Sequence, residues 1–497
     1  MTNALSYVTT FKDGFTPSSY QQNIFDFVIN NLRQGKNLSV QAVAGSGKSK
    51  TGLKTFELLP DDIDSQFVAF NRSIADELAT KLPKQNACTY HSLGSRTLRK
   101  TFPKMVIKTD KVETFLRKTY PLDRWLFYSV KKLVGLCKGM PKLDYDEHDL
   151  VRIAFDHDVD LYPEKGASIA DRIFELTLDA LRYSFNTPYV VDFDDMIWLP
   201  NVLDTVSFYQ FDFLFVDEAQ DTNMSQSNLA IRSIKPDGMI VVVGDSAQSI
   251  YRFRGADSTA MERLKRELGA TSLPLSLSYR CPTKIRDLVN QKFPNIKFET
   301  PEWAIEGNIR DVMSNKVETV IQPDDLVLCR VNADLVPLAF SLLRHDIKAT
   351  IKGRDIGNGL ISLIKKSNTT ETIDLVKWMD DWKEAEMYKA IQLNREEKIQ
   401  LIEDRFETLY AMTEGTTSVT EVVRRCETLF SDERKGVLLS TVHRAKGLEA
   451  DNVFILRPDL IPHPAAKKSN SPENLQQESN LEYVAITRAK KELTYIL

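Results

Sequence analysis

One stretch near the N-terminus constrains the fold of this chain most, residues 37–51 with the sequence NLSVQAVAGSGKSKT. Its apolar residues 38–43 predict a short strand, the small residues that follow fit a tight turn, and Lys48 opens a predicted helix. This arrangement favours an anion, because backbone N–H groups converge on it and the helix dipole attracts negative charge. We therefore expect a phosphate-binding loop in an α/β domain.

The residue types in this loop suit a nucleoside triphosphate with its metal ion. A lysine at position 48 would reach the β- and γ-phosphates, and the Ser49 hydroxyl would ligate Mg²⁺. The usual pattern begins with glycine, whereas Ala42 stands there, and a GSGKS turn alone also occurs in loops that bind nothing. The predicted phosphate cradle consists of Ala44, Gly45, Ser46, Gly47, Lys48 and Ser49.

A second acidic motif follows the apolar run 211–216, FDFLFV. Asp217 stands at the tip of this predicted strand, where a second Mg²⁺ ligand is expected beside a phosphate loop. The neighbouring Glu218 would orient or deprotonate the attacking water. The alternative is a turn with helix-capping acids, but the nearly all-apolar run before it favours a buried strand and a functional edge.

Length and composition indicate a soluble protein with several domains. The 497 residues predict roughly three or four domains, and the net charge of −4 gives no global sign of nucleic-acid binding. No stretch approaches the roughly 20 apolar residues of a membrane span, so no membrane partner is expected. The five cysteines have no CxxC spacing and are expected to be reduced thiols. The expected location is the cytoplasm, of a bacterium or of the host of a phage.

The chain alternates between strand and helix patterns except in one long segment. Apolar runs at 67–70 and 239–243 predict two more strands, in addition to those at 38–43 and 211–216. Strands that alternate with helices in this way predict a parallel, doubly wound sheet with ligands at its carboxyl edge. Residues 95–209 are mostly helical in pattern and are interpreted as an insertion. Residues 463–479 are polar with scattered prolines and predict a mobile surface loop.

Two further segments carry polar and aromatic groups that suit nucleotides. Gln21 or Gln22, on the first turn of a predicted helix, would present an amide to a base edge, although a solvent-facing polar residue is the alternative. Gln248 is a candidate γ-phosphate sensor. After it, aromatic and arginine residues alternate, a mix that stacks bases and holds a nucleic-acid backbone. These residues are Tyr251, Arg252, Phe253 and Arg254.

The chain resembles superfamily 1 DNA helicases of the UvrD/Rep type from about residue 15 to its C-terminus. Nine blocks in that family's order carry the resemblance: TPSSYQQ, AVAGSGKSKT, FVAFNRSIADEL, TYHSLGSR, LFVDEAQDT, VVVGDSAQSIYRFRGAD, LSLSYRCPTK, VLLSTVHRAKGLEADNVFIL and EYVAITRAKKEL.

The resemblance implies an α/β fold of two RecA-like parallel-sheet motor domains with helical insertion domains. The second motor domain has expected strands at 326–330, 347–351, 437–440, 453–456 and 493–496. Its insertion is short for the family, which puts duplex-binding or autoinhibitory roles in doubt. The expected parts are core 1A (1–94 and 210–275), insertion 1B (95–209), core 2A (276–357 and 434–497) and a reduced insertion 2B (358–433).

The resemblance also assigns roles by position. Gln21, or Gln22 in the alternative register, matches the adenine-reading glutamine, and Tyr279 matches the aromatic stacked on adenine, with Lys50 on its other face. Arg280 and Arg488 match two arginine fingers. Glu449 matches the ribose contact, and Gln248 matches the residue that links the γ-phosphate to the DNA groove. The residues that match the lining of the single-strand groove are Phe70, Asn71, His91, Tyr251, Phe253 and His443, with Arg254 beside them.

The implied activity is an ATP-dependent DNA helicase that moves 3′ to 5′ on single strands, with ATP and Mg²⁺ as cofactors. Single-stranded and tailed duplex DNA are the expected partners, together with a protein partner in a repair, replication or defence complex. Two alternatives stay open: a translocase that displaces proteins and unwinds weakly, or a regulatory P-loop ATPase subunit. The aromatic and arginine residues at 251–254 speak against the regulatory subunit.

Overall fold

The structure is a computed structural model that describes residues 11, 13–82, 86–122, 124–157, 159, 161, 169–250, 259–392, 396–433, 435–469 and 471–497. Tyr251, Phe253 and Arg254 therefore lie outside the described residues. The chain divides into two compact units, Met1–Leu277 and Ser278–Leu497, and each is described by itself. Among the described helices, none is long and apolar enough to cross a membrane.

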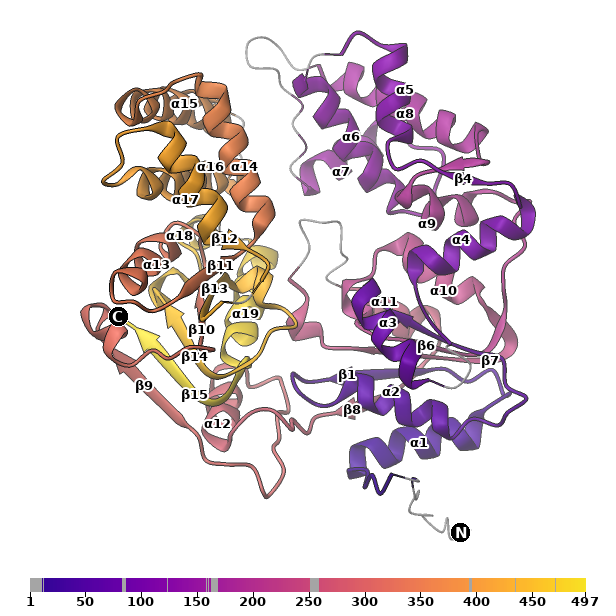
Figure 1. The fold of residues 1–497 in the computed structure, drawn as a ribbon. Helices are drawn as coiled ribbons and strands as arrows, with labels where there is room; N and C mark the ends of the chain where they lie inside the picture. Colours follow the sequence, from indigo (N-terminus) through magenta and orange to yellow (C-terminus); the bar gives the residue numbers. More distant parts are fainter. Residues whose placement is uncertain are drawn as a thin grey trace. The chain divides into compact units, whose positions relative to one another are not determined.

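The first unit is built on a six-stranded parallel sheet (Figure 1). The strand order is β3-β2-β6-β7-β1-β8, so β7 separates β1 from β6. The carboxyl ends of β1, β6 and β7 therefore lie next to one another at one edge of the sheet. The strands are β1 (Leu38–Ala42), β2 (Ser65–Ala69), β3 (Ala87–Thr89), β6 (Phe211–Val216), β7 (Ile234–Gly244) and β8 (Thr271–Leu275).

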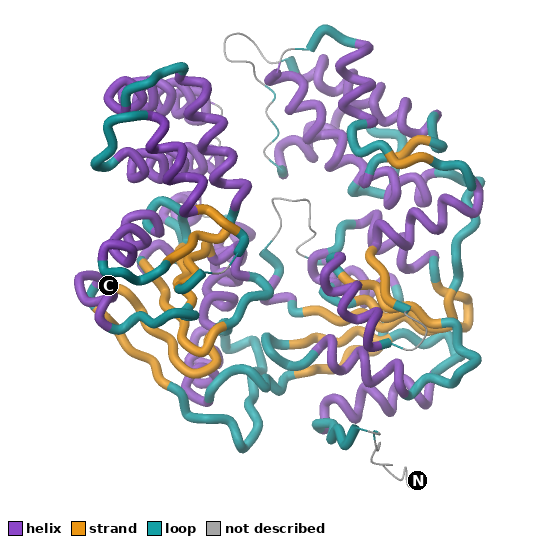
Figure 2. Tube along the Cα trace, in the orientation of Figure 1, coloured by secondary structure: helices purple, strands orange, loops and turns teal. Residues whose placement is uncertain are grey.

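Strand β6 shows why the sheet is covered on both faces. Phe213 and Phe215 belong to one hydrophobic cluster, whereas Leu214 and Val216 belong to another, because successive side chains of a strand point to opposite faces. Figure 2 shows the helices that flank the strands. The first cluster includes residues of α1 (Ser19–Asn31), α2 (Lys48–Glu57) and α3 (Arg72–Lys81), and the second includes residues of α4 (Tyr90–Thr101), α10 (Met224–Arg232) and α11 (Ala260–Glu267).

A separate helical core lies between β3 and β6 in the sequence. It includes a two-stranded sheet, β4 (Val106–Ile107) with β5 (Val190–Val191), and buries its own hydrophobic cluster. The helices of this core are α5 (Lys111–Thr119), α6 (Arg124–Lys138), α7 (Glu147–Asp156), α8 (Ala170–Asn186) and α9 (Phe193–Val202).

A buried ion network fixes the start of α9. Asp192 caps the helix and accepts from the Asp195 backbone N at 2.7 Å. Lys138 Nζ lies 2.8 Å from Asp192 Oδ2 and 2.7 Å from Asp195 Oδ1, and Lys111 Nζ lies 2.7 Å from Asp195 Oδ2. Burial alone would raise the pKa of Asp195, but the two lysines outweigh it and lower this pKa. The network therefore ties α5 and α6 to the first turn of α9.

Helices α4 and α9 cross at Gly94. A Cβ added there would lie 1.9 Å from the Met196 carbonyl oxygen, so only glycine allows this close approach. Helix α4 begins next to His91, and α9 begins at Phe193, so the crossing sets the relative position of these two rings.

The second unit is built on a seven-stranded parallel sheet, with the order β12-β11-β13-β10-β14-β15-β9. Together the two sheets confirm the predicted α/β class with two parallel-sheet domains. The strands are β9 (Asn308–Val312), β10 (Leu326–Cys329), β11 (Ala349–Lys352), β12 (Phe430–Ser431), β13 (Val437–Thr441), β14 (Ala450–Leu456) and β15 (Ala489–Ile496).

Four helices interrupt this sheet between β11 and β12, namely α14 (Arg354–Ser367), α15 (Thr372–Gln392), α16 (Glu396–Thr413) and α17 (Val419–Leu429). Leu409 and Val422 share one buried cluster with Val327 and Leu439 of the sheet. The helices therefore rest on the core of the second unit. The other helices of this unit are α12 (Thr283–Lys292), α13 (Leu335–Arg344), α18 (Pro464–Ser469) and α19 (Pro472–Ile486).

The predicted loop at 463–479 is wrong, because helices α18 and α19 occupy most of it. Pro464 and Pro472 are the first residues of these helices, where a missing N–H costs no hydrogen bond and the fixed φ suits the helix. Ser471 then caps α19 by accepting from the Asn474 backbone N. Both prolines therefore begin helices and do not interrupt regular secondary structure.

Candidate nucleotide and nucleic-acid sites

The loop between β1 and α2 is shaped to receive an anion. Gly45 and Gly47 have φ values of 71° and 78°, in the left-handed region, and Gly47 caps α2 without a side-chain hydrogen bond. The first N–H groups of α2 are thus left for a ligand. The Ser46 Oγ atom is buried without a hydrogen-bond partner in the described part of the chain. A bound phosphate would satisfy these donors.

The predicted lysine, serine and two acidic residues come together at this edge of the sheet. Ser49 Oγ donates to Asp217 Oδ2 at 2.9 Å, and Lys48 Nζ lies 3.3 Å from Glu218 Oε1. Adjacent ligands of an octahedral Mg²⁺ at about 2.1 Å are themselves about 3.0 Å apart, so the Ser49 and Asp217 oxygens would fit as neighbouring ligands. Glu218 has a φ of 52°, a strained value for a residue with a side chain.

Burial makes the charges at this site depend strongly on one another. Burial and the Glu218 carboxylate raise the pKa of Asp217 to about 6. Burial also disfavours charge on Lys48, but Glu218, Asp245 and Asp217 outweigh it and raise the pKa of the ammonium group. Lys48 therefore remains a cation among carboxylates. No group of three or more metal-ligating side chains occurs among the described residues, so Mg²⁺ at Asp217 would also need ligands from phosphate or water.

Two residues without an assigned role link this site to the end of β7. Gln220 Nε2 donates to Glu218 Oε2, and Gln220 Oε1 accepts from the Asp245 backbone N at 3.0 Å. Asp245 Oδ2 accepts from Gln248 Nε2 at 2.6 Å. The predicted sensor Gln248 thus connects to Glu218 through Gln220 and Asp245. Their position directly after strands of a parallel sheet was the signal that could have identified them.

Gln21 rather than Gln22 contacts the phosphate-loop helix. The buried Gln21 side chain donates through Nε2 to Thr51 Oγ1 at 3.1 Å, and its Oε1 accepts from the Ser18 N–H in a capping box. Gln22 donates instead to Asp26 Oδ1, within its own helix. An adenine contact by Gln21 stays a prediction.

Lys50 follows the phosphate loop on the first turn of α2. Its ammonium lies 5.4 Å from the centre of the Phe15 ring and 3.7 Å from Asp13 Oδ2. The predicted contact of Lys50 with adenine stays a prediction.

Two rings, one exposed and one partly buried, follow the carboxyl ends of β2 and β3. These strands pair in parallel with Ala69 opposite Thr89, so Phe70 and His91 follow neighbouring strand ends. Phe70 is 38% exposed, whereas Asn71 caps α3 by accepting from the Ile74 N–H at 2.9 Å. Burial lowers the pKa of His91, which keeps its ring neutral at neutral pH.

Phe193 is an aromatic residue of this surface that sequence reasoning missed. Its ring is 53% exposed and meets the His91 ring edge-on, with centroids 5.7 Å apart and planes at 85°. The sequence feature that could have identified Phe193 is an aromatic residue at the first position of a helix, directly after the acidic N-cap residue.

Three of the predicted residues of the second unit, Arg280, Glu449 and Arg488, also come together. Strands β14 and β15 pair with Ala450 opposite Ala489, so Glu449 and Arg488 lie side by side just before them. Arg280 Nη2 lies 2.6 Å from Glu449 Oε2, and Arg280 Nε is buried without a hydrogen-bond partner in the described part of the chain. The buried Arg488 donates from Nε to the Val484 carbonyl at 3.1 Å and from Nη1 to the Leu448 carbonyl at 3.2 Å.

Lys490 completes this cluster. Its ammonium lies 2.6 Å from Glu449 Oε1. Burial alone would raise the pKa of Glu449, but Lys490 and Arg280 outweigh it and lower this pKa. The predicted groove residue His443 lies in the short helix η6 (Val442–Ala445), a few residues before Glu449 in the sequence.

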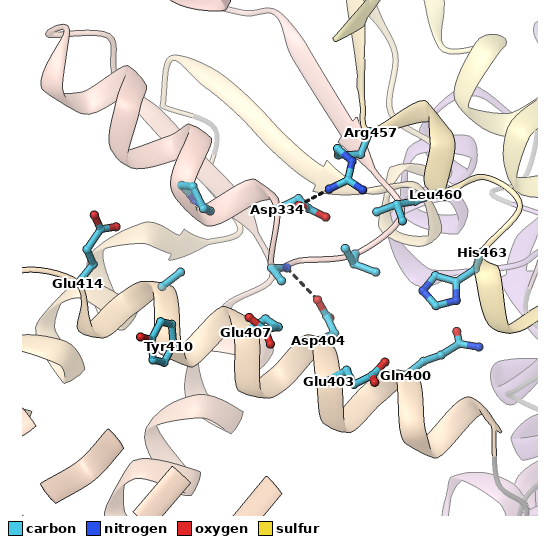
Figure 3. A pocket seen from close by; sticks show the side chains of 14 residues that line it. Asp334, Gln400, Glu403, Asp404, Glu407, Tyr410, Glu414, Arg457, Leu460 and His463 are labelled. Carbon is cyan, nitrogen blue, oxygen red and sulfur yellow. Dashed lines mark hydrogen bonds and ion pairs between the residues drawn. The ribbon is translucent and has the colours of Figure 1, made fainter. Parts of the chain in front are cut away.

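A cavity of about 470 Å³ in the second unit is a different site (Figure 3). It is lined by the start of α13, one face of α16 and the segment 457–463, and none of the predicted site residues that the structure describes is among its lining residues. Its one arginine, Arg457, pairs with Asp334 at 3.5 Å. Carboxylates on these walls disfavour phosphates, so neither the nucleotide nor the strand is expected there. The acidic lining residues are Asp334, Glu403, Asp404, Glu407 and Glu414.

Comparison with known proteins identifies relatives along most of the chain. The F-box DNA helicase protein 1 of Schizosaccharomyces pombe is 24% identical and covers 93% of this chain and 56% of the relative. The probable DNA helicase II homolog of Mycoplasma genitalium is 23% identical (92% and 82%), and the ATP-dependent DNA helicase PcrA of Staphylococcus aureus is 25% identical (62% and 58%). The chain thus spans little more than half the length of several curated relatives.

The solved structure of arterivirus nonstructural protein 10 (helicase) aligns with 95% of this chain and 62% of the viral chain, with 11% identity. The TM-score of 0.34 indicates only a weak structural similarity. Two family models match more specifically. The UvrD/REP helicase N-terminal domain matches residues 28–269, and the UvrD-like helicase C-terminal domain matches residues 436–496. These matches together cover more than half of the chain, and they include the phosphate loop, both acidic residues and Arg488. The chain belongs to the UvrD/Rep family of helicases.

Proposed function

We propose that this chain is an ATP-dependent DNA motor that hydrolyses ATP at the loop between β1 and α2 and moves 3′ to 5′ along single-stranded DNA. The observation that carries the proposal is the pair of contacts between residues that follow β1 and β6, Ser49 to Asp217 at 2.9 Å and Lys48 to Glu218 at 3.3 Å. A structural turn has no need of a buried lysine, a hydroxyl and two carboxylates at the carboxyl edge of a parallel sheet.

Each of these residues has a distinct role in hydrolysis. Lys48 binds the β- and γ-phosphates, while Ser49 and Asp217 hold Mg²⁺. When bound there, Mg²⁺ would supply positive charge opposite the phosphate oxygens. Glu218 orients the attacking water and takes its proton, and Gln220 holds the Glu218 carboxylate in place through its amide. With the phosphates bound, the Lys48 ammonium exchanges its present carboxylate partner for phosphate oxygens.

The second unit supplies the cations that act on the transferred phosphoryl group. Arg280 and Arg488 are proposed as arginine fingers, each of which is typically worth ~10³–10⁵ in rate. Arg280 is now paired with Glu449, so it would exchange this carboxylate for an oxygen of the bound nucleotide's phosphates. Glu449 is then released to accept a ribose hydroxyl, with Lys490 holding it in its charged form.

The strand contacts are proposed on the first unit and on η6. Phe70, His91 and Phe193 offer ring faces for bases, and base stacking on aromatic residues tolerates any sequence. Because Asp245 links Gln220 to Gln248, a change at Glu218 reaches the segment that precedes the aromatic and arginine residues. Asn71, Tyr251, Phe253, Arg254 and His443 are also proposed to contact the strand.

The proposed division of labour follows the expected parts of the chain: core 1A and insertion 1B in the first unit, core 2A and a reduced insertion 2B in the second. Helices α14–α17 of 2B share the hydrophobic core of 2A, so they are proposed to stiffen this unit. The substrates are single-stranded and tailed duplex DNA in the cytoplasm, where a protein partner from repair, replication or defence would direct the motor.

A strand-displacement assay with 3′-tailed and 5′-tailed duplexes tests this proposal. We expect ATP-dependent unwinding of the 3′-tailed duplex by the wild-type chain and none by the Lys48→Ala variant, which keeps its single-strand binding. Failure on both tails, with ATP hydrolysis still stimulated by single strands, would favour a translocase that displaces proteins. Equal unwinding by Lys48→Ala and wild type would contradict the assignment of the phosphate loop.

A further inference from the structure

An indole ring stands exposed next to Tyr279, in a loop without an assigned function. Trp303 is 71% exposed, which is unusual for the largest aromatic side chain. Its ring lies 6.4 Å from the Tyr279 ring, centre to centre, with the planes inclined by only 25°. Ring pairs in direct contact have centroids about 4.5–7 Å apart, so this pair is near the outer limit and nearly parallel.

Backbone hydrogen bonds hold the Trp303 loop against the residues around Tyr279. The Ser278 N–H donates to the Glu299 carbonyl at 2.8 Å, before the loop, and the Thr283 N–H donates to the Ile305 carbonyl at 3.0 Å, after it. The Ala304 N–H closes a turn to the Pro301 carbonyl at 2.9 Å. The two rings therefore stand on chain segments that are tied together on both sides, so that little conformational entropy is lost when a ligand binds.

The side chains of residues 279 and 280 contact different surroundings. The Tyr279 ring faces Trp303, whereas the Arg280 guanidinium contacts the Glu449 carboxylate and the Thr487 carbonyl. An aromatic surface thus adjoins a polar, charged cluster, and a nucleotide has the same division between its flat base and its ribose with phosphates.

We propose that Trp303 and Tyr279 together form the base-binding surface of the nucleotide site, with the purine held against both rings. The inference rests on the proposed function, which gives Tyr279 the adenine. It adds Trp303 as a second wall from the same unit. Nearly parallel rings suit a flat base, because each presents a π-face for stacking. The Glu449 carboxylate can accept a ribose hydroxyl, and a ribonucleotide offers free 2′ and 3′ hydroxyls that a DNA strand lacks, so the base of a mononucleotide fits this surface better than a base of the strand.

Tryptophan fluorescence and calorimetry test the inference. ADP is expected to quench the emission of the wild-type chain, and Trp303→Phe is expected to lose the quench while it binds ADP with nearly wild-type affinity. Trp303→Ala is expected to raise the Kd for ADP about tenfold, or about 1.4 kcal/mol, and to leave the Kd for tripolyphosphate unchanged. Trp378→Phe, on α15, is the matched control and should keep both the quench and the affinity.

Three outcomes would overturn the inference. The first is a wild-type Kd for ADP in Trp303→Ala, and the second is an equal loss of ADP and tripolyphosphate binding, which would indicate a general disturbance of the unit. The third is a Trp303-dependent quench by oligo(dT) rather than by ADP, which would assign the ring to the strand. A wild-type chain that binds and hydrolyses no ATP would instead refute the proposed function, so the two failures are distinguishable.

Discussion

Replacement of Gly94 by alanine perturbs the close helix crossing between α4 and α9, which carry two proposed strand-binding rings. The new Cβ would lie 1.9 Å from the Met196 carbonyl oxygen, and backbone cannot yield as a flexible side chain does, so α4 and α9 have to separate by about 1 Å or more. Overpacking of this kind typically costs ~1–3 kcal/mol. For a unit of this size we expect the Tm to fall by roughly 2–12 °C.

The same separation moves His91 on α4 away from Phe193 on α9, whose rings now meet at 5.7 Å. A stacked base is worth ~1–3 kcal/mol, so partial loss of this surface should weaken oligo(dT) binding about tenfold. Differential scanning calorimetry measures the Tm, and fluorescence anisotropy of labelled oligo(dT) measures the affinity. Gly359→Ala on α14 is the control, because its Cβ meets nothing within 4 Å and alanine favours a helix.

Two results would refute this reasoning at different points. A Gly94→Ala variant with the Tm and the oligo(dT) affinity of the wild type would show that α4 and α9 do not approach as closely as the structure has them. A lowered Tm with unchanged affinity would leave the packing argument intact and remove His91 and Phe193 from the strand site.

Two further predictions concern buried charge and the chemical step. Lys138→Met removes a cation from Asp192 and Asp195 and should lower the free energy of unfolding by ~3–5 kcal/mol in urea titrations. The control is Lys131→Met, an exposed position on the same helix, which should lower it by less than ~1 kcal/mol. Equal losses in the two variants would argue against the network. Glu218→Gln should bind Mg²⁺-ATP in a filter assay but turn it over ~10²–10⁴-fold more slowly, and wild-type turnover would exclude Glu218 as the base.

The parts of the site that sequence analysis predicted are those encoded locally. Residues 38–49 contain a strand, its turn glycines and a helix start within one short segment, and the apolar run of β6 places Asp217 and Glu218 at a strand end. Parallel pairing then brings such ends to one edge of the sheet, whatever lies between them in the sequence.

The features that the sequence did not predict depend on contacts between distant segments, or on residues whose usual local preference does not hold at their position. The proposed role of Trp303 depends on its contact with the Tyr279 ring, 24 positions earlier in the sequence. The segment between them has no periodic pattern that would predict this contact. Strand β9 reads NIRDV, polar and partly exposed, because it is an edge strand and needs little apolar surface. Prolines at 464 and 472 suggested a loop, although the first helical position tolerates them.

In the proposed function, the carboxylates and the lysine at one sheet edge hydrolyse ATP when a single strand is bound. The most direct measurement is the steady-state ATPase rate of the wild-type chain with no nucleic acid, with single-stranded DNA, with blunt duplex DNA and with single-stranded RNA. We expect strong stimulation by single-stranded DNA, little by the duplex, and none in Lys48→Ala under any condition. Hydrolysis that is absent throughout, or that proceeds at one rate whether or not a single strand is present, would contradict the account.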